Sequence, residues 1–282
     1  MIKEKAYAKL NLSLKVISKM ENGFHELESI MVPVVDLYDE LFFEENDTEE
    51  FILLDNEIEN NSIIKAAKAF QQKYKTKGAK IRLVKRIPLE AGLAGGSADS
   101  SATLRGLNRL FNLNIPLIEL EDLAKQLGSD NVFCLHNKAA ICRGRGELLE
   151  FIDSDFQFEV LLIKPSFGLL TKDVFNNLLI KKSNHVLNNI KLALKTGDYE
   201  LLDNNIFNDL LEPALKIEPQ LQDVMNKIKK HNVKCHMSGS GSTLYVICNK
   251  KVMLDFGKDE IEYVYLKKHL VKSKVNDWIK ND

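Results

Sequence analysis

The sequence lacks a dominant charge, a long apolar run and an export signal. Its 39 lysines and arginines almost balance its 40 aspartates and glutamates, so the net charge is −1. A near-neutral chain does not attract a polyanion strongly, and we expect no nucleic-acid partner. No apolar run approaches the length that spans a bilayer, and no signal-peptide pattern opens the chain. We therefore expect a cytoplasmic protein without a membrane partner, either a monomer or a homodimer.

Cysteine is scarce and follows no known pattern. The four cysteines show neither a C-x-x-C pair nor the spacing of metal ligands. They are Cys134, Cys142, Cys235 and Cys248. We expect free thiols in a reducing compartment. Internal repeats and low-complexity segments are also absent from the sequence.

The composition is that of an ordinary globular protein, with 45% hydrophobic and 28% charged residues. A chain of 282 residues is near the length at which one core stops growing and chains divide. The stretch 151–156, Phe-Ile-Asp-Ser-Asp-Phe, is a plausible boundary and precedes a buried strand pattern at 159–165. We therefore predict two domains, residues 1–155 and 156–282. The acidic stretch 44–59 is interpreted as a solvated loop.

The most informative segment is residues 88–102, which read Pro-Leu-Glu-Ala-Gly-Leu-Ala-Gly-Gly-Ser-Ala-Asp-Ser-Ser-Ala. Alternating apolar residues over 80–87 predict a strand before it, and helical spacing predicts a helix over 98–112 after it. The inward face of the strand would carry Ile81, Leu83 and Ile87. Three glycines and a polar cluster thus lie between a strand and a helix.

Gly92, Gly95 and Gly96 indicate a phosphate site in this segment. Glycine lets the backbone approach a ligand closely, and the first amides of a helix point at whatever precedes it. Together they form an anion site, and phosphate is its usual occupant. An ordinary turn capped by Ser97 or Asp99 needs fewer glycines. The segment is not a Walker loop, because no Lys-Ser/Thr pair follows, and its spacing does not fit the dinucleotide fingerprint.

Residues 6–16 predict a strand with an apolar and a polar face. Leu10, Leu12, Leu14 and Val16 alternate with Lys9, Asn11, Ser13 and Lys15. Taken by itself, Lys9 would be a surface lysine. A turn signal follows at Asn22-Gly23. It leaves Phe24 and His25 exposed in a loop unless another segment covers them.

Further elements follow from periodicity and capping. A strand is predicted over 32–43 with a break at 36–39. A helix capped by residues 60–62 would bury Ile63, Ala66, Ala67 and Phe70. An amphipathic helix over 116–127 ends at Gly128. Residues 184–231 are predicted to be mostly helical.

Asp130 lies between this helix end and the apolar run 131–135, which we interpret as a strand. An aspartate here is ordinarily a turn residue, although it could also point into a cleft. Residues 139–147 predict a turn between two strands. A second glycine segment, Met237-Ser-Gly-Ser-Gly-Ser-Thr243, precedes a strand at 244–248.

Three of these segments resemble the motifs of the GHMP kinases, the galactose, homoserine, mevalonate and phosphomevalonate kinase superfamily. Pro88 to Ala98 is similar to the central motif Pro-x-x-x-Gly-Leu-Gly/Ala-Gly-Ser/Gly-Ser-Ala. Ala8-Lys9-Leu10-Asn11-Leu12 and Met237 to Thr243 resemble the first and third motifs. The resemblance covers about residues 6–248. It implies an α+β, two-domain fold, with an N-terminal domain like the second domain of ribosomal protein S5 and a ferredoxin-like C-terminal domain.

The resemblance also implies an ATP-dependent kinase with an alcohol acceptor. Asp130 would be the base and Lys9 would orient it. ATP would lie over Pro88, Leu89, Glu90, Ala91, Gly92, Leu93, Ala94, Gly95, Gly96, Ser97 and Ala98. Mg²⁺ would bridge its phosphates near Ser97, and no direct metal ligand is identified.

The segment Gly23-Phe24-His25-Glu26-Leu27 resembles one branch of the superfamily, which phosphorylates the 2-hydroxyl of a cytidine diphosphate-linked methylerythritol in non-mevalonate isoprenoid synthesis. In that branch the aromatic residue and the histidine hold the cytosine. Phe24 stands where tyrosine is more common, which retains the stacking face. The implied substrate-binding residues are Asn11, Phe24, His25, Phe175, Gly239, Ser240 and Gly241.

Two other functions remain open at this point. One is a sister kinase acting on a smaller alcohol such as homoserine or mevalonate, against which Phe24 and His25 argue. The other is a nucleotide-binding protein that has lost catalysis. It is favoured by Val132, where the family has proline, and by Lys138, where glycine is common. The presence of both Lys9 and Asp130 argues against it.

Overall fold

A computed structural model of the protein describes residues 1–54, 62–181, 186–248 and 263–275. The helices are α1 (Ser62–Tyr74), α2 (Gly95–Leu110), α3 (Leu117–Leu127), α4 (Asn131–His136), α5 (Thr171–Asn176), α6 (Leu187–Thr196), α7 (Tyr199–Asn205), α8 (Leu211–Ile217) and α9 (Gln220–Lys229). The strands are β1 (Ile2–Lys19), β2 (His25–Glu45), β3 (Ile52–Leu54), β4 (Ala79–Val84), β5 (Ala140–Gly144), β6 (Leu148–Phe151), β7 (Gln157–Pro165), β8 (Phe207–Asn208), β9 (His236–Met237), β10 (Leu244–Cys248) and β11 (Tyr263–Lys272).

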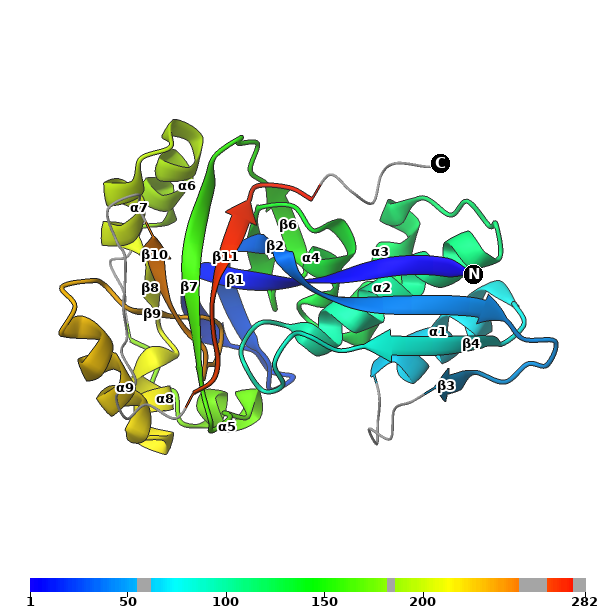
Figure 1. The fold of residues 1–282 in the computed structure, drawn as a ribbon, viewed down its shortest axis with the longest axis horizontal. Coiled ribbons are helices and arrows are strands. Elements are labelled where there is room, and N and C mark those ends of the chain that lie inside the picture. The colour runs from blue at the N-terminus through cyan, green and yellow to red at the C-terminus, as the bar shows by residue number, and fades with distance from the viewer. Residues whose placement is uncertain (55–61, 182–185, 249–262, 276–282) are drawn as a thin grey trace.

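Two long antiparallel strands, β1 and β2, run through the middle of the molecule (Figure 1). The C-terminal end of β2 pairs with β4, which also pairs with β3. The N-terminal part of β2 pairs with β5. β11 joins β2 to β7, which continues through β10 to β9. The described strands therefore form one connected, mixed sheet. The prediction of an α+β fold is confirmed.

The described residues form two hydrophobic cores, and β1 contributes to both. The larger core lies between the sheet and helices α1 to α4, extends to α6 and α7, and includes Leu10 and Leu12. The second lies between β7, β10 and helices α5, α8 and α9, and it includes Leu14 and Val16. Figure 1 shows α1 to α3 and the helices of the second core at opposite ends of the long strands. A single strand is thus anchored in both cores, and Lys9 lies on it between Ala8 and Leu10 of the larger core.

Several predicted elements are confirmed. The strand before the glycine segment is β4, and the helix after it is α2. α1 buries the four residues predicted for its inner face, α3 ends where Gly128 follows, and β7 and β10 lie where buried strands were expected. Of the residues predicted to cap α1, those at 60 and 61 lie outside the described range.

Three predictions about secondary structure were wrong. Residues 131–135 form helix α4 and not a strand, because a short apolar run has the same appearance in either element. α2 begins at Gly95, three residues before the predicted start. Ile87 is buried but follows β4, which ends at Val84.

The predicted break at 36–39 and the loop at 44–59 also need correction. β2 is continuous through Asp36, whose Oδ1 accepts hydrogen bonds from the backbone of Leu270 and from the ring of His269, both on β11. The register with β1 slips there, from Val34 to Tyr38. β11 comes from the end of the chain, so no local pattern indicated this partner. Within 44–59, β2 extends to Glu45 and β3 occupies Ile52–Leu54, and residues 55–59 lie outside the described range.

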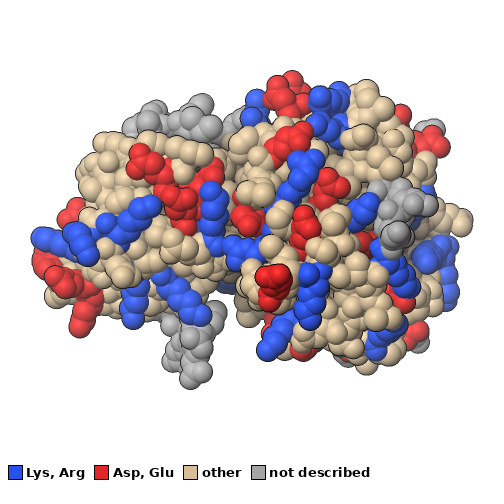
Figure 2. All heavy atoms as spheres, turned by 180° about the vertical axis from the view of Figure 1, so that it is seen from behind, with Lys and Arg blue, Asp and Glu red and all other residues tan. Residues whose placement is uncertain are grey.

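The surface carries mixed charge, and Figure 2 shows basic and acidic side chains interspersed over the rear face. Among the described residues, no helix is both long and apolar enough to cross a membrane.

Candidate active site

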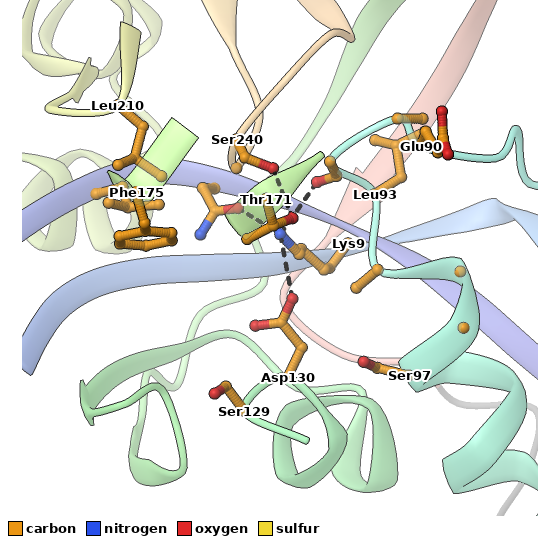
Figure 3. A pocket seen from close by; sticks show the side chains of 18 of the residues that line it. Lys9, Glu90, Leu93, Ser97, Ser129, Asp130, Thr171, Phe175, Leu210 and Ser240 are labelled. Carbon is orange, nitrogen blue, oxygen red and sulfur yellow. Dashed lines mark hydrogen bonds and ion pairs between the residues drawn. The ribbon is translucent and has the colours of Figure 1, made fainter. Parts of the chain in front are cut away.

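A cavity of about 750 Å³ lies where β1, the glycine segment and α5 meet (Figure 3). The predicted site residues that line it are Lys9, Asn11, Phe24, His25, Pro88 to Ser97, Asp130, Phe175, Gly239 and Ser240. Two others do not line it. Ala98 is buried within α2, and Gly241 lies against Met237 and Leu169. Residues separated by more than 200 positions thus share one space.

The start of α2 opens into this cavity without a cap. Ala94, the residue before the helix, has a φ of 58° and offers no side chain to the first amides. Gly95, Gly96 and Ser97 all line the cavity, and Figure 3 shows Ser97 directed into the space between α2 and Asp130. The first amides of a helix need external acceptors. This arrangement fits an anion such as phosphate.

Lys9 and Asp130 form the charged centre of the cavity. Lys9 Nζ lies 3.5 Å from Asp130 Oδ2, and it donates to Asn11 Oδ1 at 2.6 Å and to Gly92 O at 3.0 Å. The Lys9 side chain is 4% exposed, whereas that of Asp130 is 28% exposed. The ammonium is therefore held by three oxygens inside the protein, while the carboxylate remains accessible to a ligand. Lys9 is therefore not the surface lysine that its strand position taken by itself would suggest.

Asp130 is held by the first turn of α4, where its carbonyl accepts from the amide of Cys134 at 3.0 Å. Arg105 on α2 anchors the other end of this helix by donating to the carbonyls of Cys134 and Leu135, at 2.9 and 3.3 Å. Val132, in place of the usual proline, is a buried residue in the first turn of α4. The first helical turn accepts proline or valine, so this substitution leaves the anchoring intact.

Asn11 uses both ends of its amide inside the protein. Its Oδ1 accepts from Lys9, and its Nδ2 donates to Ser29 Oγ at 2.8 Å. Ser29 in turn donates to the carbonyl of Ser13. The polar face predicted for β1 is therefore buried from Lys9 to Ser13, and the side chains there are hydrogen-bonded to each other and to β2. This network fixes the position of the Lys9 ammonium.

The two glycine segments touch at Gly92. Its carbonyl accepts from Ser238 Oγ as well as from Lys9, both at 3.0 Å. A Cβ on Gly92 would lie 2.1 Å from the carbonyl oxygen of Ser238. The two backbones approach so closely that only glycine fits at position 92. The contact joins residues 88–102 to the segment that begins at Met237, a residue of the second core.

An aromatic slot forms the other end of the cavity. The rings of His25 and Phe175 stack with centroids 4.9 Å apart, and Phe24 is 49% exposed beside them. The guanidinium of Arg145 lies over the Phe24 ring, 5.0 Å from its centroid. Burial, with a smaller contribution from the charge of Lys19, lowers the pKa of His25. The neutral imidazole can both accept and donate a hydrogen bond, as a nucleobase requires.

A second charged cluster lies below the start of α2. Lys85 Nζ donates to Asp39 Oδ2 at 2.6 Å and to Asp99 Oδ2 at 2.7 Å. Burial raises the pKa of Asp99 to about 7, Lys85 opposes this shift, and Asp39 adds to it. Lys85 lines the cavity, close to Gly95. The cluster therefore lies next to the glycine segment at the start of α2.

Several polar residues that line the cavity were not predicted as site residues. They are Ser29, Lys85, Ser129, Arg145, Thr171, Lys172 and Asn176. Arg145 lies between Gly144 and Gly146 in the turn that was interpreted only as a connection, and Thr171 and Lys172 precede Phe175. Neither segment by itself indicated a role for these side chains. Only the folded chain brings them to the cavity.

Comparison with known proteins identifies the family of the chain. The profile of the GHMP kinases N terminal domain matches residues 61–138, and that of the GHMP kinases C terminal domain matches residues 190–262. The chain therefore belongs to the GHMP kinases, ATP-dependent phosphotransferases. The predicted resemblance and the two-domain GHMP kinase fold are both confirmed. The division at residue 155 stays a prediction.

Curated relatives narrow the group further. A Staphylococcus haemolyticus protein, provisionally named a 4-diphosphocytidyl-2-C-methyl-D-erythritol kinase, is 38% identical over 266 residues, which is 89% of this chain and 92% of the relative. A protein of the same provisional name from Staphylococcus aureus (strain MRSA252) is 38% identical over 262 residues, with the same coverage.

Solved structures of GHMP kinases resemble the chain in fold. A crystal structure of 4-(cytidine 5'-diphospho)-2C-methyl-D-erythritol kinase superposes with a TM-score of 0.75 at 28% identity, over 87% of this chain and 90% of that chain. The mevalonate kinase of L. major, at 14% identity and a TM-score of 0.70 over 98% and 97% of the two chains, shares the fold.

Proposed function

We propose that this protein transfers the γ-phosphoryl group of ATP to the 2-hydroxyl of 4-diphosphocytidyl-2-C-methyl-D-erythritol, in the non-mevalonate synthesis of isoprenoid precursors. One observation carries the proposal: a single cavity contains the uncapped start of α2, the Lys9–Asp130 pair and the aromatic slot. In the view of Figure 3, Lys9 and Asp130 lie between Ser97 and Phe175. The relatives named above support the same substrate.

The phosphates of ATP bind to the first amides of α2, whose dipole favours negative charge there. The residues present also fit Mg²⁺ that arrives with the nucleotide. The described residues contain no group of three or more acidic, histidine or cysteine side chains that could hold a metal alone. Mg²⁺ usually retains waters and binds through substrate phosphates with few protein ligands. Ser97 is the candidate ligand, and the ion would offset charge on the phosphates.

Asp130 acts as the general base in the reaction. The 2-hydroxyl oxygen bonds to the γ-phosphorus, the bond from that phosphorus to the β–γ bridging oxygen breaks, and ADP leaves with that oxygen. The hydroxyl proton passes to Asp130. Lys9 orients this carboxylate and compensates negative charge beside it, and Asn11 and Gly92 hold Lys9 in turn. Asn11 is thus a positioning residue in addition to a lining residue.

The cytosine of the acceptor binds in the aromatic slot. Phe24 and Phe175 offer ring faces, and the His25 imidazole offers a polar edge. Homoserine or mevalonate has no base to place there, so this slot favours the cytidine substrate over the acceptors of sister kinases. A catalytically silent protein would not need the accessible carboxylate at Asp130.

The test is ADP release with Mg-ATP and each of three acceptors: 4-diphosphocytidyl-2-C-methyl-D-erythritol, homoserine and mevalonate. We expect turnover with the cytidine substrate alone. Turnover with either small alcohol instead would retain a kinase but refute the slot as a cytosine site. Folded protein that binds ATP and turns over none of the three would refute the proposal.

A further inference from the structure

The cations that line the cavity differ in whether protein carboxylates already neutralise them. Lys9, Lys85 and Arg145 each lie within ion-pair distance of at least one acidic side chain. Lys172 also lines the cavity and is exposed to solvent. Its ammonium makes no hydrogen bond or ion pair with any residue in the ranges that the structure describes. The charge available to an incoming anion is therefore that of Lys172.

The position of Lys172 is set by α5. Thr171, the preceding residue, shares a hydrogen bond of 2.9 Å with Ser240. Ser240 follows Gly239, where a Cβ would lie 3.2 Å from Lys9 Nζ. In the view of Figure 3, Thr171 lies between Phe175 and Lys9. The helix thus begins next to the Lys9 ammonium.

The same helix carries Phe175 to the aromatic slot. Residues three apart lie on one helix face, so Lys172 and Phe175 both face the cavity, which they both line. Thr171 and Phe175 are separated by about 6 Å along the helix axis, at 1.5 Å per residue. Lys172 therefore stands between the slot that holds the base and the pair that performs the chemistry.

The proposed acceptor has a diphosphate in the corresponding place, between its nucleoside and its methylerythritol. With the base in the slot and the hydroxyl at Asp130, this diphosphate runs along α5. A lysine has a compact charge, three donors and a flexible stem, all of which suit a phosphate whose exact position varies. We infer that Lys172 binds the diphosphate of the acceptor and makes the site selective for nucleoside diphosphate-linked alcohols. This inference rests on the function proposed above.

The test measures binding of three probes, cytidine, CMP and CDP, by isothermal titration to the full chain. The variants are Lys172→Met, which removes the charge at similar length, and Lys172→Arg, which retains it. Lys195→Met is the matched control, because Lys195 is also an exposed helix lysine but does not line the cavity. ADP binding and the kinetics of the cytidine substrate are measured on the same four proteins.

We expect wild type to bind CDP more tightly than cytidine. Lys172→Met should weaken CDP binding by about 10- to 100-fold, the value of one charge-assisted hydrogen bond. Cytidine and ADP binding should be unchanged. The KM for the cytidine substrate should rise by the same factor, with kcat within about twofold of wild type, because the contact is equal in ground and transition states. Lys172→Arg should restore most of the CDP affinity, and Lys195→Met should behave as wild type.

Three results would overturn the inference about Lys172 without affecting the proposed function. Unchanged CDP affinity in Lys172→Met would show that the lysine does not meet the diphosphate. An equal loss for cytidine and CDP would show that the residue only shapes α5. A loss confined to ADP would assign the lysine to the other nucleotide. Failure of wild type to bind either cytidine or CDP would instead refute the cytidine substrate, and the assignment of Lys172 with it.

Discussion

The contact between the two glycine segments provides the most direct test of the site, through the variant Gly92→Ala. Gly92 has a φ of 69°, which disfavours side chains, and its new Cβ would lie 2.1 Å from Ser238 O and 3.0 Å from Gly241 O. Both neighbours are backbone atoms and cannot rotate away. The segments must therefore separate by about 1 Å to restore an ordinary carbon–oxygen contact.

The expected cost follows from what this separation breaks. An alanine in the left-handed region is strained by about 1–2 kcal/mol. Separation also weakens the hydrogen bonds that the Gly92 carbonyl accepts from Ser238 and from the charged Lys9, worth about 0.5–1.5 and 1.5–3 kcal/mol. We expect the free energy of unfolding to fall by about 3–6 kcal/mol. A displacement of about 1 Å at the phosphate segment should lower kcat/KM about 100-fold.

Gly197→Ala is the matched control. Gly197 also has a positive φ, 72°, but its Cβ would meet only the Phe156 ring, at 3.5 Å, and the residue lies outside the cavity. It should lose about 1–2 kcal/mol from strain alone and retain activity. Denaturant titration and ADP release are measured on both variants. If Gly92→Ala lost no more stability and no more activity than Gly197→Ala, the close approach of the two segments would have no functional role.

Three further variants test other parts of the site. Asp130→Asn removes the proton acceptor at constant size. ADP-release assays should show kcat reduced at least about 100-fold, with the KM for ATP changed less than about threefold. A near-normal kcat would exclude Asp130 as the base. Arg105→Met removes a donor from the carbonyls of Cys134 and Leu135 and the buried ion-pair partner of Glu4, and it should lower the free energy of unfolding in denaturant by about 3 kcal/mol. A loss below about 1 kcal/mol would contradict the anchoring of Asp130 through Arg105. Asp99→Asn tests the cluster at Lys85 through unfolding at several pH values. Since the folded state keeps the Asp99 proton up to about pH 7 while the unfolded chain releases it near pH 3.8, wild type loses stability across this window and is level above it. Asparagine does not ionise, so its stability relative to wild type should rise from pH 4 to 7, and a difference independent of pH would refute the raised pKa.

The glycine segments show how far local patterns reach. Gly92, Gly95 and Gly96 predicted an anion site between a strand and a helix, and the structure places them at an uncapped helix start beside a cavity. The strand and the helix around them are confirmed because these elements depend on residues next to each other, while the anion itself stays a prediction. The same holds for the inner face of α1 and the end of α3.

Other parts of the site depend on segments far apart in the sequence. Asn11 has the pattern of a polar strand residue, yet its role in holding Lys9 requires β2 on one side and Gly92 on the other. Asp130 was expected before a strand, but Arg105 and the packing of α4 on α2 make the segment helical. Periodicity does not contain these partners, because a short apolar run packs equally well in either element.

By itself, the sequence determined the family, the glycine segment between a strand and a helix, and the positions of Lys9 and Asp130 within family motifs. Each of these depends on a contiguous motif whose chemistry can be read from neighbouring residues. The tertiary structure alone decided that Lys9 is buried, that Gly92 touches Ser238, and that Lys172 lines the cavity with no acidic partner among the described residues. Burial, close contact and the absence of a counter-ion are properties of how distant segments pack, and only the folded chain establishes them.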